Sequence, residues 1–161
     1  LNNCDGKVFV ENCDIKKHKM RHRKLVNYAP AEVLYPDFLT GNDLIDFYVE
    51  AKGGIKDIAL ALSEKILLRD ALAKKTGTYS SGMKKKLALV LAFIGRPAWI
   101  LLDEPLITLD VASVHVVLSM VQEYAQKGIG FIITSHQDAE FGAGHLQLEP
   151  LSIKNRQLIF E

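Results

Sequence analysis

The 161 residues include 20 Lys and Arg against 19 Asp and Glu, a balance that excludes a strong positive field for recruiting nucleic acid or anionic membranes. The composition, 48% apolar and 24% charged, is that of a globular protein and excludes a disordered chain. The longest uninterrupted apolar run covers residues 87–94, far short of the roughly 20 residues that a membrane-spanning helix needs.

The start of the chain and its two cysteines indicate whether the sequence is complete and in which cellular compartment the protein lies. The chain opens on Leu1 rather than Met, in sequence typical of the middle of a domain, so we interpret it as a fragment. No signal-peptide pattern is present. Two cysteines, Cys4 and Cys13, form neither a disulfide framework nor a zinc site, which indicates free thiols in a reducing cytosol.

The first part of the chain predicts two short strands around a basic segment. Residues 7–11 alternate between apolar and polar, and residues 25–28 form the second candidate strand. Between them, residues 16–24 hold six Lys or Arg and two His, which we interpret as a solvated loop. Pro30 and Pro36 then indicate a further loop.

The middle of the chain predicts helices. An amphipathic helix opens at residues 40–43 and ends at Gly53 and Gly54. Further helices are expected at about residues 55–67, 70–73 and 82–94, with a Gly, Ser and Thr loop at residues 76–81.

The last part predicts a strand, a helix and a strand. Residues 99–102 and 131–133 are apolar throughout, and a helix is expected between them at about residues 111–126. Strands that are apolar on both faces belong in a parallel sheet with helices on both sides. The crossover brings both carboxyl ends to one edge, where such sheets place their chemistry. Asp103, Glu104 and His136 follow these ends. The tail predicts two short strands around residues 151–155.

Asp103 and Glu104 are candidate catalytic carboxylates, because neighbouring residues at a strand end point in different directions. Asp103 can hold Mg²⁺ directly or through water. Glu104 can orient or deprotonate an attacking water. The alternative is a buried strand that runs into an acidic turn without further role.

Ser80, Ser81 and Gly82 stand at the start of the helix expected over residues 82–94. The first N–H groups of a helix are unpaired and its dipole is positive there, so this end suits a phosphate group. Gly82 lets an anion approach the backbone, and the lysines at residues 84–86 add positive charge. The alternative is an ordinary serine N-cap beside a solvated lysine face.

His136 and Asp110 complete the candidate set. His136 can donate a hydrogen bond to a phosphate oxygen, although a lone His is commonly a packed or surface residue. Asp110 can be a helix N-cap and no more. The order of the motifs carries more weight than any one of them. Asp103 lies 21 residues after Gly82, and Asp110 and a Thr-Ser-His sequence follow it.

In this order the motifs resemble those of the ATP-binding cassette (ABC) ATPases. Residues 79–83 look like the signature motif in the Ser-Ser-Gly-Met form of exporter-type cassettes. Residues 99–104 look like Walker B with the catalytic glutamate, and residues 106–110 like the D-loop. Residues 25–32 resemble the strand that enters the Q-loop, and His136 is similar to the switch histidine.

The chain also departs from the family pattern. The P-loop motif Gly-x-x-x-x-Gly-Lys-[Ser/Thr] does not occur in the 161 residues, so we expect most nucleotide affinity to be missing from this piece alone. Ala31 stands in place of the Q-loop glutamine, and Ser81 in place of a signature glycine. The D-loop reads Ile-Thr-Leu-Asp rather than Asn-Gly-Leu-Asp.

The resemblance implies an α/β fold, namely a RecA-like P-loop NTPase core with a mostly parallel sheet, flanking helices and an inserted α-helical subdomain. The N-terminal strands and the P-loop are missing from it. Residues 1–36 and 97–161 would form the partial core, and residues 37–96 the helical signature-motif subdomain. Tyr35 and Phe38 are candidates for docking a transporter, with core packing as the alternative.

The resemblance also implies roles, with ATP and Mg²⁺ bound between two cassettes arranged head to tail. Ser80, Ser81 and Gly82 would contact the γ-phosphate of a nucleotide held by the opposite protomer. Asp103 would position Mg²⁺ through water, Glu104 would polarise the attacking water, His136 would hold phosphate and water in line, and Asp110 would bridge the protomers. The partners would be a second cassette, identical or different, and transmembrane permease subunits on the inner face of the cell membrane, without nucleic acid.

Three functions are compared. The favoured one is the ATPase subunit of an ABC transporter of the exporter type. A non-transport cassette acting on DNA or ribosomes is favoured only by the basic run at residues 16–24. A catalytically silent partner cassette is favoured by Ala31 and the missing P-loop, but opposed by Asp103, Glu104 and His136.

Overall fold

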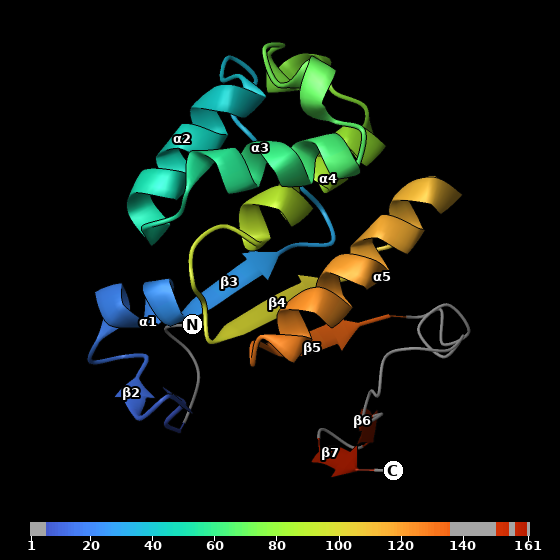
Figure 1. Ribbon diagram of the computed structural model, residues 1–161. Coiled ribbons are helices and arrows are strands. Elements are labelled where there is room, and N and C mark those ends of the chain that lie inside the picture. The colour runs from blue at the N-terminus through green and yellow to red at the C-terminus, as the bar shows by residue number, and fades with distance from the viewer. Residues whose placement is uncertain (1–5, 136–150, 155–156, 161) are drawn as a thin grey trace.

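The computed structural model describes residues 6–135, 151–154 and 157–160. A three-stranded parallel sheet of order β3-β4-β5 lies at its centre (Figure 1). The strands are β3 (Val26–Ala29), β4 (Trp99–Asp103) and β5 (Gly130–Thr134). Their register aligns Tyr28 with Leu101 and Leu101 with Ile132. The predicted parallel sheet is therefore confirmed, with β4 in the middle.

Helices α4 (Ser81–Ala92) and α5 (Val111–Gln126) pack on one face of this sheet. The inward side chains of β4, Ile100 and Leu102, are 0% and 1% exposed there. Helix α5 has the bounds that the sequence predicts, because Asp110 caps its first turn. The Phe93 ring meets Tyr124 edge-on at 4.8 Å between centroids and lies 6.0 Å from Phe131, so aromatic rings tie the end of α4 to α5 and β5.

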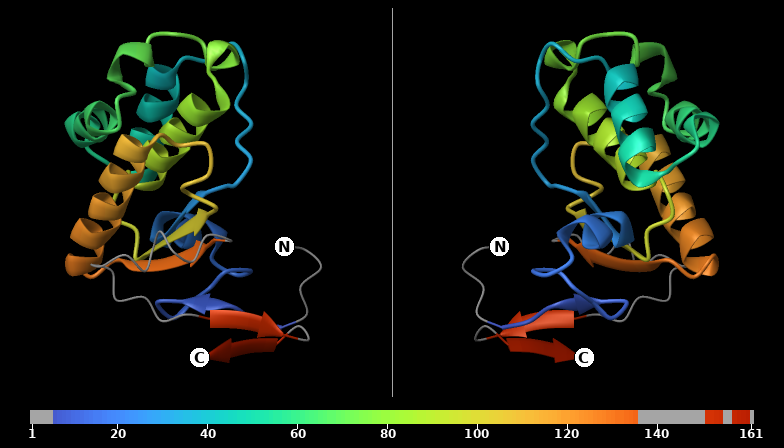
Figure 2. Two further views of the ribbon diagram at one scale, coloured as in Figure 1. Left: turned by 90° about the vertical axis from the view of Figure 1, so that its right-hand side faces the viewer. Right: turned by 90° about the vertical axis from the view of Figure 1, so that its left-hand side faces the viewer.

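Helices α2 (Gly41–Lys52) and α3 (Lys56–Lys65) stack on α4, followed by the short 3₁₀ turns η1 (Arg69–Ala71) and η2 (Thr76–Thr78). Figure 2 shows α2, α3 and α4 gathered at one end of the molecule. Thr40 and Asp43 form a reciprocal capping box at the start of α2, and Gly53 ends it with a φ of 68°. Local sequence signals thus fix both ends of this helix.

The sequence predicts helices on both faces of the sheet, but in the described residues the face opposite α4 and α5 is exposed. Tyr28, Trp99 and Ile132 point to this face and are 53%, 37% and 51% exposed. Within residues 6–135, α4 and α5 bury only the other side chains of these strands. Tyr28 and Ile132 flank Leu101 in one row across the sheet. This face is therefore an apolar surface in the part of the chain that the structure describes.

The N-terminal segment folds differently from the predicted strand and loop. Residues 7–11 contribute only the two-residue β1 (Phe9–Val10), which pairs antiparallel with β2 (Cys13–Asp14). Most of the basic run forms the helix α1 (Lys19–Leu25) rather than a loop. Lys, Arg, Met and Leu favour helices, and Lys52 of α2 donates hydrogen bonds to the carbonyls of Arg23 and Val26 at the helix end. Packing against α2 and β3 decides this helix.

Two remaining predictions can be followed in the described residues. The tail forms an antiparallel hairpin of β6 (Leu151–Lys154) and β7 (Gln157–Phe160), as expected. Cys13 is a buried free thiol, while Cys4 lies outside the described residues. No helix in the described ranges is both long enough and apolar enough to cross a bilayer.

Candidate functional site

Asp103 is the last residue of β4, and donors from both neighbouring strands hold its carboxylate. The Thr134 hydroxyl of β5 donates to Oδ1 at 2.5 Å, and the Tyr28 hydroxyl of β3 donates to Oδ2 at 3.2 Å. The Thr134 hydrogen bond, with help from Tyr28 and the Ala31 backbone N–H, keeps the pKa of Asp103 below its ordinary value. Asp103 is therefore an ionised, oriented acceptor at the edge of the sheet.

Glu104 follows directly, in an unusual backbone conformation. Its φ is +45°, in the left-handed region that a non-glycine residue seldom adopts. Its backbone N–H donates to the Thr134 carbonyl at 3.1 Å and to the Thr134 hydroxyl at 3.2 Å. Such strain costs about 1–3 kcal/mol and occurs most often at functional sites, where the surroundings maintain it. The chain thus turns sharply between the two acidic residues.

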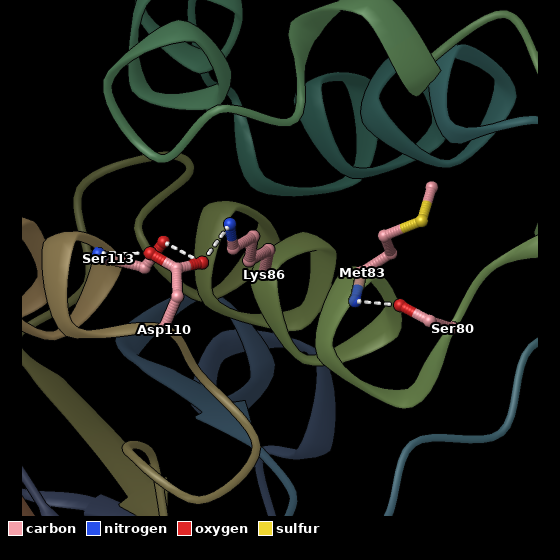
Figure 3. Close-up of polar contacts among 5 residues, drawn as sticks. All are labelled: Ser80, Met83, Lys86, Asp110 and Ser113. Carbon is pink, nitrogen blue, oxygen red and sulfur yellow. Dashed lines mark hydrogen bonds and ion pairs between the residues drawn. The ribbon is translucent and has the colours of Figure 1, made fainter.

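The start of α4 is exposed at the two serines. Ser80 is the N-cap, and its Oγ accepts a hydrogen bond from the Met83 backbone N–H at 3.2 Å (Figure 3). Ser81 is the first residue of the helix, and both serine side chains are exposed. Ser80 therefore has the geometry of an ordinary N-cap, as the alternative interpretation predicts. Because both serines are exposed, a ligand could still reach this end of the helix.

Packing against residues 106–110 requires a glycine at position 82. A Cβ at this position would lie 2.8 Å from the Thr108 carbonyl oxygen, which is closer than side-chain carbons approach backbone atoms. The D-loop segment, residues 106–110, therefore lies directly against the first turn of α4. The absence of a side chain at Gly82 therefore allows this segment to approach the helix closely, while the close approach of an anion stays a prediction.

The lysines at residues 84–86 do not form the solvated face that the sequence suggests. Lys85 is 2% exposed and donates to the carbonyls of Pro30, at 2.9 Å, and Asp103, at 3.1 Å. Burial lowers its pKa, and the nearby charges of Asp103 and Glu104 oppose that shift. The Lys86 side chain is 12% exposed and pairs with Asp110. These two lysines tie α4 to the ends of β3 and β4 and to the D-loop segment.

Asp110 is the N-cap of α5 and accepts three bonds within its own chain (Figure 3). Its carboxylate receives the Ser113 backbone N–H at 2.8 Å, the Ser113 hydroxyl at 2.9 Å and the Lys86 ammonium at 2.7 Å. The Lys86 contact and the Ser113 bonds hold the pKa of Asp110 far below its ordinary value. The N-cap reading of Asp110 is confirmed.

The structure gathers the candidates into two groups. Asp103, Glu104 and Thr134 lie at the shared carboxyl edge of β4 and β5, whereas Ser80, Ser81 and Gly82 open α4 beside the D-loop segment. His136 lies outside the described residues. The sequence analysis assigned no role to Thr134 and Tyr28, and it gave Lys85 only a share in the positive charge beside α4. Only Thr134 carried a signal, because its hydroxyl directly follows a predicted strand that lies beside the one ending at Asp103.

Whether the described residues could hold Mg²⁺ depends on the oxygen ligands that they offer. Within the described residues, His, Cys, Asp and Glu form no group of three or more that could enclose a metal. Mg²⁺ characteristically uses one or two carboxylates, with waters and substrate phosphates completing its six ligands. The Asp103 carboxylate accepts hydrogen bonds from Thr134, Tyr28 and the Ala31 backbone N–H, and because its two oxygens offer about four lone-pair sites, it keeps room for a further ligand. Asp103 therefore fits a metal bound mainly by phosphates and water.

Comparisons with known proteins agree with these motifs. Residues 1–107 match the family model described as "ABC transporter". The chain is 30% identical over 139 residues to the mouse ATP-binding cassette sub-family A member 17, covering 84% of this chain and 8% of the relative. It is 33% identical over 135 residues to the ABC transporter ATP-binding protein YtrB of Bacillus subtilis strain 168, covering 82% of this chain and 45% of the relative. The chain thus spans less than half the length of either relative.

Solved structures give the same result for the fold. One, titled as the ATP-binding subunit of an ABC transporter, matches with a TM-score of 0.76 at 24% identity, covering 81% of this chain and 56% of that one. Another, titled as a post-hydrolysis dimer of an ATP-binding cassette with ADP and Pi, matches with a TM-score of 0.73 at 16% identity, covering 84% and 65%. At these identities the likeness concerns the fold alone.

Proposed function

Because the chain belongs to the ABC transporter family and has the α/β RecA-like fold of its ATPase cassettes, we propose that it is part of the subunit that hydrolyses ATP to drive transport. Family membership and the likeness to YtrB support a transporter ATPase role in general. The observation that carries the specific proposal is the edge of β4, where Thr134 and Tyr28 orient the Asp103 carboxylate and Glu104 follows with a left-handed backbone.

The start of α4 is proposed to bind the triphosphate of a nucleotide carried by a second cassette, identical or different, placed head to tail. Ser80 and Ser81 are exposed, and the unpaired N–H groups and positive dipole end of α4 attract an anion. Gly82 keeps the D-loop segment against this turn, so both would approach the second cassette together. This face then supplies positioning, which is most of what phosphoryl transfer asks of a protein.

Asp103 is proposed to hold Mg²⁺ through water, and Glu104 to polarise the attacking water. When bound, Mg²⁺ supplies neutralising charge to the phosphate oxygens of ATP. Asp103 keeps its orientation through Thr134 and Tyr28, so little reorganisation is needed during the reaction. His136 is proposed to hold the γ-phosphate and the water in line. Asp110 is proposed to fix the D-loop segment that bridges the two protomers.

The helical part at residues 37–96 is proposed to face transmembrane permease subunits, with the partial core at residues 1–36 and 97–161. A cavity of about 580 Å³ lies between α1, β3, α2 and α4, and residues of both parts line it. Its apolar lining includes Leu34, Tyr35 and Phe47, of which Leu34 is 91% exposed. Tyr35 lines the cavity and is partly buried against the core, which agrees with the packing alternative, whereas Phe38 is exposed outside the cavity. The protein would then be cytoplasmic and peripheral on the inner face of the cell membrane.

A catalytically silent partner cassette is the second candidate. Ala31 provides only a backbone N–H to Asp103, where the family has a glutamine side chain. Such a protein would offer the start of α4 to ATP held by an active cassette without hydrolysing ATP itself. The alternative of action on DNA or ribosomes receives no comparable support, because part of the basic run, including Arg23 and Lys24, lines the apolar cavity.

The test is Glu104→Gln in the complete protein. This change keeps the size of the side chain and removes its charge, so we expect ATP binding to remain and steady-state hydrolysis to be abolished. ATP binding is measured by equilibrium titration and hydrolysis by phosphate release. Unchanged hydrolysis in the variant would refute the role of Glu104, and a wild-type protein that binds a second cassette but releases no phosphate would favour the silent partner.

A further inference from the structure

One hydroxyl lies between the two acidic residues of the candidate site. Thr134 is the last residue of β5, and the sheet register pairs it with Asp103. Its Oγ1 is 2.5 Å from Asp103 Oδ1 and 3.2 Å from the Glu104 backbone nitrogen. The Glu104 N–H also lies 3.1 Å from the Thr134 carbonyl oxygen. Thr134 therefore contacts the side chain of one acidic residue and the backbone of the next.

The chemistry of these groups sets the direction of each hydrogen bond. The Glu104 N–H can only donate, and an ionised carboxylate can only accept. A threonine hydroxyl has one proton and two lone pairs. The Thr134 hydroxyl therefore accepts a hydrogen bond from the Glu104 N–H and donates its one hydrogen bond to Asp103. The 2.5 Å between Thr134 Oγ1 and Asp103 Oδ1 is typical of a charge-assisted hydrogen bond to a carboxylate. The resulting chain of bonds leaves the hydroxyl no freedom to rotate.

The hydrogen bonds of Thr134 hold both the Glu104 backbone and the Asp103 carboxylate in place. Glu104 has a φ of +45°, and its N–H bonds to Thr134 hold it in that strained conformation. Asp103 is held by Thr134 on Oδ1 and by Tyr28 on Oδ2, so its carboxylate is fixed between the two neighbouring strands. Removing the Thr134 hydroxyl would release the orientation of Asp103 and weaken the support of Glu104 together. Removing the Tyr28 hydroxyl would affect Asp103 alone.

We propose that Thr134 is a positioning residue that fixes Asp103 and Glu104 relative to each other for ATP hydrolysis. The proposal rests on the function proposed above for those two residues. Thr134 is exposed at the end of its strand, so its hydroxyl is not needed to complete the core. Groups that orient a metal-binding residue typically contribute about 10- to 100-fold in metal affinity or activity.

The first test compares Thr134→Val, which keeps the shape and removes the hydroxyl, with Thr134→Ser, which keeps the hydroxyl. In the complete protein, Thr134→Val should lower the turnover number by about 10- to 100-fold and raise the Mg²⁺ concentration for half-maximal hydrolysis. Binding of ATP without metal should stay unchanged, and Thr134→Ser should stay close to wild type. Tyr28→Phe should raise the Mg²⁺ requirement with a smaller loss of turnover. Wild-type kinetics in Thr134→Val, or equal losses in both Thr134 variants, would refute the proposal.

The second test needs no activity. In the protein without nucleotide, the Glu104 amide should exchange its hydrogen faster in Thr134→Val than in wild type, and at the wild-type rate in Thr134→Ser. Equal protection in all three proteins would refute the positioning of Glu104. If the wild-type protein binds no ATP, the proposed function fails, while the exchange rates still decide whether Thr134 holds Glu104.

Discussion

Thr108 offers the sharpest test of the backbone geometry. It lies in the D-loop segment, and its φ is +69°. A β-branched residue in this left-handed region is a conformational outlier, because its Cβ crowds the backbone. Its side chain is exposed and contributes no core packing. Thr108→Gly is therefore expected to stabilise the protein, whereas most substitutions destabilise.

The expected size of this effect follows from two opposing terms. Relief of left-handed strain contributes about 1–3 kcal/mol. The greater freedom of glycine in the unfolded chain costs about 0.4–1 kcal/mol. The net gain in the free energy of unfolding is about 1 kcal/mol, which for a chain of this size raises the melting temperature by about 2–4 °C.

Thermal and urea unfolding followed by circular dichroism measure this gain. Thr108→Ala retains a Cβ in the left-handed region and should recover less than half of the gain. Ala61→Gly introduces glycine at an exposed position inside α3, where it should lower the stability by about 1 kcal/mol. A lower midpoint for Thr108→Gly than for wild type would show that Thr108 is not strained and refute the reasoning.

Two further predictions concern the contacts of the D-loop segment. Gly82→Ala should destabilise by about 1–3 kcal/mol in urea unfolding despite the helix preference of alanine, because its Cβ would lie 2.8 Å from the Thr108 carbonyl oxygen. The loss should persist in a Thr108→Gly background, which keeps that carbonyl, and full rescue there would contradict the contact. Asp110→Ala should cost about 1 kcal/mol near pH 7 through loss of the N-cap. Because the Lys86 contact and the Ser113 bonds lower the pKa of Asp110 in the folded state, its contribution is complete above about pH 4, the unfolded pKa, and is lost as pH falls further. The stability difference between wild type and Asp110→Ala should therefore shrink in acid, and a difference independent of pH would refute this account.

The parts of the fold that the sequence predicted are those with local signals. Helix α2 is bounded by a capping box at Thr40 and a left-handed Gly53, and α5 starts at the Asp110 cap. Strands β4 and β5 are uninterrupted apolar runs that stop at polar residues. In each case, a few neighbouring residues satisfy the backbone or mark the buried face, so no distant partner is needed to recognise the element. The motif order then identified the family without any knowledge of the structure.

What the sequence determined alone is therefore the identity of the chemical groups and the elements that carry them: two carboxylates after a buried strand, and two serines and a glycine at a helix start. The tertiary structure decided their partners. Thr134 and Tyr28 meet Asp103 from 31 and 75 residues away, because the register of the parallel sheet brings three strand ends together. The run of lysines predicts a solvated Lys85. In the structure this side chain is buried and donates hydrogen bonds to two carbonyls that are distant in sequence. Such contacts depend on packing between elements far apart in the chain, and no local pattern of residues encodes them.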